Sequence, residues 1–248
     1  MLEDDFNDVL SKAIRGLGAN ATSLGVDQDR LRRCLSGNLD TELIRTIAPQ
    51  LSLNTEKLLA LASYDPQVTI PANLKMFTSP FGHLGVNAYV VETTHYILIF
   101  DTGTDAAKMI RYITLHAPAK TQHIFITHEH PDHIECLADF PQAQIHHPTL
   151  QHGEKLKYDD ISITVLDVAG HADPAIAYHL EGLESDICIV GDAIFAGSIG
   201  GCKTLASYPI ALKNIREHLL TLPDATYLCS GHGGVTTVAL EKANNPFL

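Results

Sequence analysis

A stretch of seven residues in the middle of the chain carries an unusual density of side chains that can bind a metal ion. Thr127–His133 reads Thr-His-Glu-His-Pro-Asp-His and follows an apolar run, His123–Ile126. The apolar run predicts a buried strand. In an extended backbone, side chains two residues apart point the same way, so His128 and His130 can converge on one ion.

The second half of this stretch changes direction. Pro131 breaks strand pairing and turns the chain, so Asp132 and His133 can face a second point close by. Three imidazoles and one carboxylate within six residues form a ligand set that suits zinc, iron or manganese. A solvated turn with incidental histidines is the alternative interpretation.

Three later segments repeat one local pattern. In each, an apolar run ends in glycine and a metal-capable side chain follows at once: Gly170-His171, Gly191-Asp192 and Gly231-His232. Glycine lets the backbone approach its neighbours closely. One such segment is weak evidence, but three of them together with the central cluster predict one metal centre assembled from distant strand ends.

Two further residues are candidates for supporting roles. Asp101 ends the strand-like run 96–100 and precedes Thr102-Gly103, so we expect its carboxylate to orient a ligand histidine or the ligand-bearing turn. A simple turn aspartate is the alternative. Lys203 lies beyond the loop 191–201 and is a candidate contact for a substrate carboxylate.

The chain divides into a helical part and a mixed part. Apolar residues recur at helical spacing from about 6 to 63, and Pro66, Pro71 and Pro80 end that pattern, so we expect domains at 1–65 and 75–248. The second domain alternates strands with helices. Its expected helices span 106–116 and 134–140, and its expected strands span 86–92, 96–100, 123–127, 144–146, 162–168, 186–190 and 226–229.

The helical part contains a spacing typical of a helix-turn-helix. Ala21–Val26 supplies a small residue and a turn glycine, and Leu31 and Cys34 supply apolar anchors on the next helix. The segment resembles the helix-turn-helix domain of lambda-repressor-like regulators. Its second helix starts with Asp27-Gln28-Asp29, and the two carboxylates would be repelled by the phosphates of DNA. Residues 1–65 also contain seven Lys/Arg against ten Asp/Glu. We therefore expect a packing or homodimerisation module and no nucleic-acid partner.

Composition limits the partners and the cellular compartment that we expect for this chain. The formal net charge of −12 disfavours nucleic acid and anionic lipid. The five cysteines form no CxxC pair, which favours a reducing, cytoplasmic location. The acidic N-terminus is unlike a signal peptide, and no apolar run approaches the ~20 residues of a membrane helix, so no membrane partner is expected.

Residues 75–248 resemble the metallo-β-lactamase-fold superfamily of metallohydrolases in the order of these motifs. The segments 191–200 and 231–237 look most like short glyoxalase II-type (hydroxyacylglutathione hydrolase-like) proteins. The resemblance implies an α+β fold, an αββα sandwich preceded here by a small all-α bundle. It also implies that His128, His130 and His171 hold one metal, that Asp132, His133 and His232 hold a second, and that Asp192 bridges the two.

This resemblance implies a hydrolase with two divalent ions per chain, zinc first, with iron or manganese as alternatives. A metal-bridging hydroxide would attack a small thioester or related acyl substrate, with Asp132 and Asp192 as the catalytic carboxylates. Two other functions remain open: a mononuclear-iron sulfur (persulfide) dioxygenase, and a DNA-binding regulator whose metallohydrolase-derived domain senses a ligand.

Overall fold

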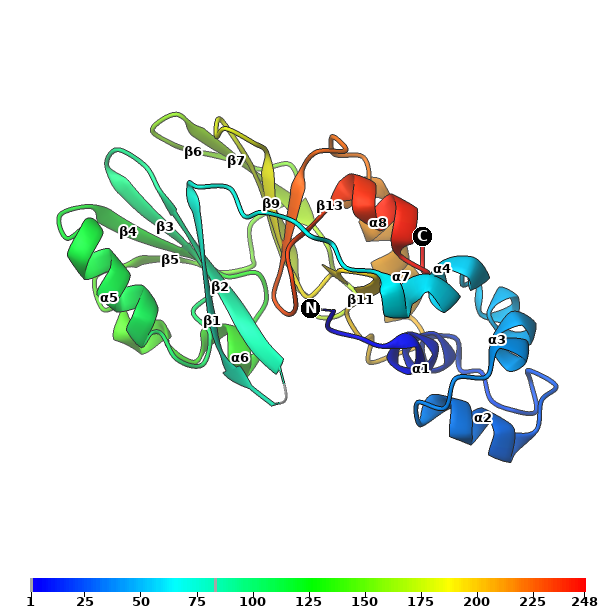
Figure 1. The fold of residues 1–248 in the computed structure, drawn as a ribbon. Coiled ribbons are helices and arrows are strands. Elements are labelled where there is room, and N and C mark those ends of the chain that lie inside the picture. The colour runs from blue at the N-terminus through cyan, green and yellow to red at the C-terminus, as the bar shows by residue number, and fades with distance from the viewer. Residues whose placement is uncertain (1, 83) are drawn as a thin grey trace.

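Two β-sheets lie face to face with helices on both outer sides (Figure 1). This computed structural model describes residues 2–82 and 84–248. One outer layer is the helix α5 (Ala107–His116), and the other contains the C-terminal helices and the N-terminal helical module. The fold is therefore the α+β sandwich that the sequence predicts.

The first sheet has five strands in chain order. Its strands are β1 (Leu74–Phe81), β2 (Leu84–Glu92), β3 (Tyr96–Phe100), β4 (Thr121–Phe125) and β5 (Gln144–His146). The first three strands pair antiparallel, and β3, β4 and β5 pair parallel. Phe100 pairs with Phe125, so the residues that follow β3 and β4 emerge side by side at one sheet edge.

The second sheet has six strands in the order β13-β12-β9-β8-β7-β6. Its strands are β6 (Lys155–Tyr158), β7 (Ile161–Asp167), β8 (Ile176–Glu181), β9 (Ile187–Gly191), β12 (Tyr227–Ser230) and β13 (Thr236–Thr237). The parallel pair β9 and β12 places Gly191 beside Ser230. A small hairpin of β10 (Ile194–Phe195) and β11 (Ser198–Ile199) follows β9.

The remaining elements are helices. They are α1 (Phe6–Leu17), α2 (Gln28–Leu35), α3 (Thr41–Ile47), α4 (Thr55–Ala60), α6 (Pro131–Ile134), α7 (Ser207–Asn214) and α8 (Val238–Asn244), with a π-helical turn at Ile215–Leu219 and 3-10 turns at Pro49–Leu51, Leu61–Ser63 and Leu137–Asp139. Among the described residues, none of these helices has the length and apolarity needed to cross a membrane.

Alternation along the strands explains how the first sheet is covered on both faces. On β2, Tyr89 and Val91 belong to the cluster between the sheets, whereas Ala88 and Val90 belong to the cluster under α5. This period of two is what a strand buried on both faces requires. The inter-sheet cluster also contains Phe125 from β4, so both sheets and the ends of their strands are fixed by one packed layer.

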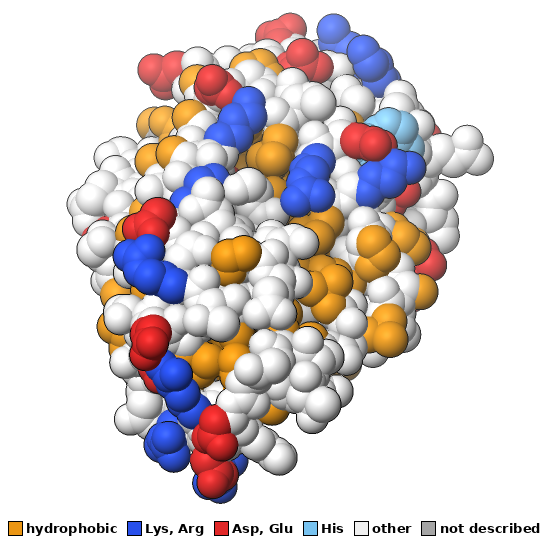
Figure 2. Space-filling view, turned by 90° about the vertical axis from the view of Figure 1, so that its right-hand side faces the viewer, with side chains coloured by type: hydrophobic (Ala, Val, Ile, Leu, Met, Phe, Trp, Pro, Cys, Tyr) orange, Lys and Arg blue, Asp and Glu red, His pale blue; other side chains and the backbone are white. Residues whose placement is uncertain are grey.

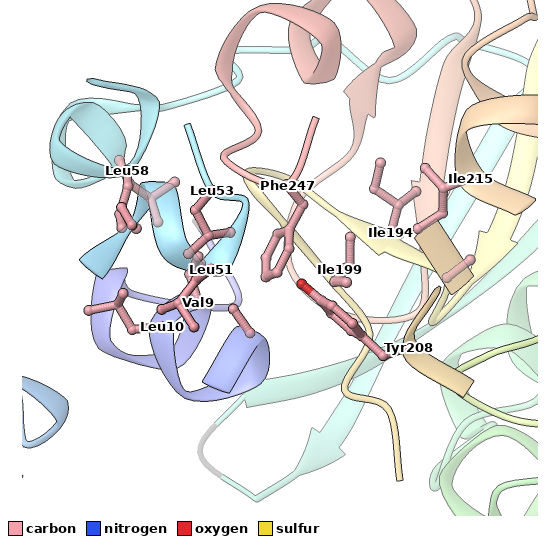
Figure 3. Close-up of a cluster of buried hydrophobic side chains, with 14 of the residues drawn as sticks. Val9, Leu10, Leu51, Leu53, Leu58, Ile194, Ile199, Tyr208, Ile215 and Phe247 are labelled. Atoms are coloured by element: carbon pink, nitrogen blue, oxygen red, sulfur yellow. The ribbon is translucent and has the colours of Figure 1, made fainter. Parts of the chain in front are cut away.

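The N-terminal helices pack directly on the second sheet's outer layer. Val9 and Leu51 share one buried cluster with Ile199, Tyr208 and Phe247 (Figure 3). The helical module and the sandwich therefore share a hydrophobic core across their junction. The sheet begins at Leu74, but the domain boundaries expected from the sequence stay a prediction.

The helix-turn-helix interpretation also stays a prediction. Helix α2 begins at Gln28 with Asp27 as its N-cap, where the sequence places the second helix. The preceding residues, Asn20–Val26, form hydrogen-bonded turns and no regular helix. A packed helical module is thus present.

Candidate metal centre

The seven predicted ligands lie together at the edge where β3, β4, β9 and β12 end. The turn after β4 carries four of them. His130 lies on extended backbone, and Pro131 starts helix α6 and places Asp132 and His133 in its first turn. His171, Asp192 and His232 come from the second sheet's loops.

The first group of ligand atoms consists of three histidine nitrogens. Nδ1 of His130 lies 3.0 Å from Nε2 of His128 and 3.0 Å from Nε2 of His171. Three imidazole nitrogens this close together cannot each carry a proton, but they can hold one proton or one metal cation between them. These three residues satisfy the geometry of a common metal site.

The second group combines a carboxylate with two histidines. Oδ2 of Asp132 lies 3.2 Å from Nε2 of His232 and 3.6 Å from Nε2 of His133. Asp192 lies between the two groups, with its Oδ2 at 3.5 Å from Nε2 of both His171 and His232. The arrangement therefore brings together all seven residues and puts Asp192 where both groups meet.

In three of the ligand histidines, the nitrogen that points away from the site has a fixed partner. Nδ1 of His171 lies 2.8 Å from the Gly201 carbonyl oxygen, and Nδ1 of His232 lies 2.8 Å from that of Gly85. Nδ1 of His133 lies 2.8 Å from Oδ2 of Asp101. Such partners fix the ring orientation and tautomer of a metal ligand. Asp101 thus contacts a candidate ligand histidine, and its supporting role stays a prediction.

Close backbone approach explains two of the glycines that precede ligands. Gly191 has φ of +51°, and a Cβ there would lie 2.6 Å from Oγ1 of Thr127. A Cβ on Gly231 would lie 2.3 Å from Oδ1 of Asp192 and 2.6 Å from Cε1 of His133. The glycines leave room for the ligands themselves, which is the physical basis of the repeated pattern.

Burial and charge divide the histidines into two kinds. Burial lowers the pKa of His128 to about 2 and also lowers the pKa values of His130 and His171, so this group is neutral with free lone pairs. Burial opposes charge on His232 too, but Asp132 and Asp192 outweigh it and raise its pKa to about 10. The carboxylates of Asp132 and Asp192 thus favour a positive charge at this site.

The residues fit divalent metal ions. Nε2 of His133 and Oδ1 of Asp192 are buried and have no hydrogen-bond partner among the described residues. An orphaned donor or acceptor of this kind is costly unless something coordinates it. Neutral imidazoles and ionised carboxylates at these positions are the donor set that zinc, iron or manganese takes.

A cavity opens beside the three-histidine group. It has a volume of about 490 Å³ and is lined by His130, His171, Lys203, Thr204 and other residues of the same loops. Nζ of Lys203 lies 3.0 Å from Nε2 of His130. The sequence-predicted lysine therefore reaches the mouth of the site and gives this side a positive charge.

Two further residues near the centre, Thr127 and Lys12, make contacts that no sequence pattern predicts. Thr127 donates from its backbone N and its Oγ1 to the Asp101 carboxylate, which locks the start of the ligand turn. Lys12 of α1 approaches from the N-terminal module and donates from Nζ to the Ile199 carbonyl oxygen at 2.8 Å. Helical periodicity identifies Lys12 only as a polar position on α1, so the sequence pattern does not predict that Lys12 lies near the metal centre.

Comparisons with known proteins agree with this geometry. Residues 81–161 match the model of the metallo-beta-lactamase superfamily. The probable metallo-hydrolase YqgX of Bacillus subtilis is 28% identical over 209 residues, which cover 71% of this chain and 98% of that protein. The hydroxyacylglutathione hydrolase GloC of Haemophilus influenzae is 36% identical over 99 residues, which cover 40% of this chain and 46% of GloC. The chain thus spans less than half the length of that relative.

Solved structures show the same fold. The BLEG-1 B3 metallo-beta-lactamase superposes with a TM-score of 0.58 at 25% identity, covering 70% of this chain and 99% of that one. TTHA1623 in a di-iron-bound form superposes with a TM-score of 0.52 at 25% identity, covering 69% and 100%. The superfamily implies divalent metal binding and metal-dependent hydrolysis.

Proposed function

We propose that this chain is a dinuclear metal-dependent hydrolase of small thioesters or related acyl compounds. The observation that carries the proposal is the position of Asp192 between two complete groups of ligand atoms, at 3.5 Å from a histidine of each. His128, His130 and His171 would hold one ion, Asp132, His133 and His232 the other, and Asp192 both. A neighbour of this fold has been solved in a di-iron-bound form, which supports two ions per chain.

Bound divalent ions would supply a Lewis acid and a hydroxide-equivalent nucleophile near neutral pH. The chain's own residues position the reacting groups. Asp132 and Asp192 are the carboxylates that can accept a hydrogen bond from the attacking water and fix its direction. Asp132 is itself held by His232 at 3.2 Å, so its free orientations are few.

The acyl substrate would enter through the cavity beside His130. Lys203 can bind a carboxylate or another anionic group of the substrate there, while Thr204 on the same wall offers a hydroxyl. A thiolate is a good leaving group that needs little help from a general acid. The thioester preference also draws support from GloC, whose name is that of a hydroxyacylglutathione hydrolase.

The test combines metal content with a hydrolysis panel. Protein loaded separately with zinc, iron and manganese is assayed by elemental analysis and against thioesters, lactones, β-lactams and phosphodiesters. We expect close to two ions per chain and the highest kcat/KM on a thioester. Full activity with one ion per chain would remove the dinuclear mechanism. Oxygen-dependent sulfite formation with one iron per chain would point instead to the sulfur dioxygenase.

The basic residues of the N-terminal module argue against DNA binding. Arg30 forms ion pairs with Asp40 and Glu42, and Arg32 pairs with Asp29. Acidic and basic side chains are interspersed over the face in Figure 2. Phosphate recognition needs a continuous basic surface. The module packs on the sandwich. We propose that it can also form a homodimer, which sedimentation analysis of the full chain would test.

A further inference from the structure

The hairpin of β10 and β11 connects two residues of the metal centre. It begins shortly after Asp192 and ends shortly before Gly201, whose carbonyl oxygen lies 2.8 Å from Nδ1 of the candidate ligand His171. A Cβ on Gly200 would collide with the Asp192 carbonyl oxygen, so the end of the hairpin packs directly on the backbone of Asp192. The position of the hairpin therefore affects both the Asp192 backbone and the orientation of the His171 ring.

The N-terminal module holds the second strand of this hairpin. Lys12 on α1 donates from Nζ to the Ile199 carbonyl oxygen at 2.8 Å and forms an ion pair with Asp4. The Lys12 side chain is only 12% exposed, and its Nζ lies 5.0 Å from the centre of the Phe195 ring on the first strand. A lysine buried this far needs such partners. One side chain of α1 thus contacts both strands of the hairpin.

Glu241 on α8 holds the turn of the same hairpin. Its side chain is fully buried, and its Oε2 accepts hydrogen bonds from the Gly197 backbone N and from Nδ2 of Asn245 at 2.9 Å each. Asn245 also donates from Nδ2 to the Ser198 carbonyl oxygen at 2.9 Å. The turn is therefore fixed at a backbone donor and at a backbone acceptor.

The end of the N-terminal module lies on this turn as well. Tyr64 donates from its hydroxyl to Oε1 of Glu241 at 2.8 Å. Gly197 has φ of +75°, and a Cβ there would lie 2.5 Å from Cδ1 of Leu61 and 3.1 Å from Cδ1 of Tyr64. Ile199 belongs to the buried cluster that the hairpin shares with the module (Figure 3). The module therefore contacts the hairpin at its turn and along its second strand.

We propose that the N-terminal module positions His171 by holding the hairpin, with Lys12 and Glu241 as the positioning residues. Lys12 fixes the backbone at Ile199, and the chain that follows presents the Gly201 carbonyl oxygen to Nδ1 of His171. Both positioning residues act on the ligand through the backbone. By reciprocity, an ion bound at His171 should in turn stabilise the hairpin. The inference rests on the metal site of the proposed function and is independent of the substrate.

Lys12→Met tests the contact with α1, because it keeps the apolar stem and removes the ammonium group. Competition between the full chain and a chromophoric chelator for Zn²⁺ measures metal affinity. We expect the affinity to fall on the order of tenfold, the low end for loss of an outer partner, because His171 keeps the Gly201 carbonyl oxygen. Amide hydrogen exchange of the metal-free protein should become faster over residues 194–201, which is a readout that needs neither ion nor substrate.

Lys57→Met is the matched control. Lys57 on α4 also joins the module to the rest of the chain, through hydrogen bonds from Nζ to the carbonyl oxygens of Lys242 and Leu248 at 2.7 and 2.8 Å. Its zinc affinity and its exchange over residues 194–201 should equal those of the wild type. An equal loss of affinity in this variant would mean that docking of the module in general supports the site, and would overturn the specific role of the hairpin contact.

Two substitutions of Glu241 test the hold on the turn. In Glu241→Gln, the amide oxygen can still accept from the Gly197 backbone N and Asn245, while the amide N can donate to the hydroxyls of Tyr64 and Thr236. Glu241→Leu loses all of these hydrogen bonds. We expect nearly wild-type zinc affinity in Glu241→Gln and a loss like that of Lys12→Met in Glu241→Leu. Equal losses in the two variants would overturn the positioning role of Glu241.

The outcomes separate this inference from the proposed function. Unchanged zinc affinity in Lys12→Met, whatever its hydrogen exchange, would overturn the positioning role of the module and leave the hydrolase proposal intact. Wild-type protein that binds two zinc ions but cleaves no thioester would overturn the hydrolase proposal. The loss of affinity expected in Lys12→Met would still support the positioning role in that case.

Discussion

Oδ2 of Asp101 lies 2.8 Å from Nδ1 of His133, and both side chains are buried. The same carboxylate accepts hydrogen bonds from the backbone N and Oγ1 of Thr127 at 2.8 Å each. Asp101 itself adopts φ of 57°, a conformation that few residues other than glycine, asparagine and aspartate tolerate. One residue at the end of β3 therefore fixes both the start and a ligand of the turn that follows β4.

Asp101→Ala should weaken metal binding while leaving the sandwich folded. His133 would lose the partner that sets its ring orientation, and the loss of such partners costs about 10–100-fold in metal affinity. Competition with a chromophoric chelator measures the change. Asp139→Ala removes an exposed carboxylate from the 3-10 turn after α6 and serves as the control. An unaltered affinity in Asp101→Ala would show that His133 needs no such partner.

Asp192→Ala should affect both ions. Asp192 is buried and touches histidines of both ligand groups, so its removal takes a ligand from each. We expect metal content to fall well below two per chain and kcat/KM to drop by at least about 100-fold. Elemental analysis and thioester assays on the same sample check this. Turnover near the wild-type level would remove Asp192 from the bridging position.

The candidate ligands could be predicted from sequence because their chemistry is local. The spacing of His128, His130 and His133 and the glycine ahead of each later ligand are visible without a fold. Their convergence depends on strand order, because β3, β4, β9 and β12 end at one edge only after long-range pairing. The resemblance supplied that step, and the structure gives its geometry.

The sequence patterns did not predict some of the strands, and the structure shows the physical reasons. β8 (Ile176–Glu181) is buried on both faces, so it lacks the alternation that marks a half-exposed strand. β1 (Leu74–Phe81) contains Pro80, which an edge strand tolerates but which disfavours a strand in sequence. The approach of Lys12 to the hairpin depends on how α1 packs against α7. No local pattern encodes that contact.

Gly231→Ala should disturb the centre without changing any ligand. A Cβ at 2.3 Å from Oδ1 of Asp192 forces the carboxylate or the backbone to move. We expect weaker metal binding and a loss of about 1–3 kcal/mol in the free energy of unfolding. Gly25→Ala is the control, because Gly25 has φ of +66° and open space around its Cβ position. It should cost about 1 kcal/mol at most through backbone strain and leave metal affinity alone.

Asp159 should give the fold a pH-dependent stabilisation at the sheet end far from the metals. A hydrogen bond from the Thr93 hydroxyl, together with bonds from the His95 ring and backbone N, lowers the pKa of Asp159 to about 2. Its pKa in the unfolded chain is near 3.8, so the folded state favours the carboxylate. The stabilisation is present above about pH 4 and is lost as the pH falls toward 2.

Asp159→Asn should therefore be less stable than wild type at pH 7, and the difference should narrow as the pH falls from 5 to 3. Urea unfolding across this range measures it. Asp160→Asn, the exposed neighbour in the same turn, should show no such trend. Metal content should stay at the wild-type value, because Thr93 and His95 lie before β3 and the ligands lie beyond its other end. A constant stability difference from pH 7 to pH 3 would mean that the carboxylate charge of Asp159 does not stabilise the fold.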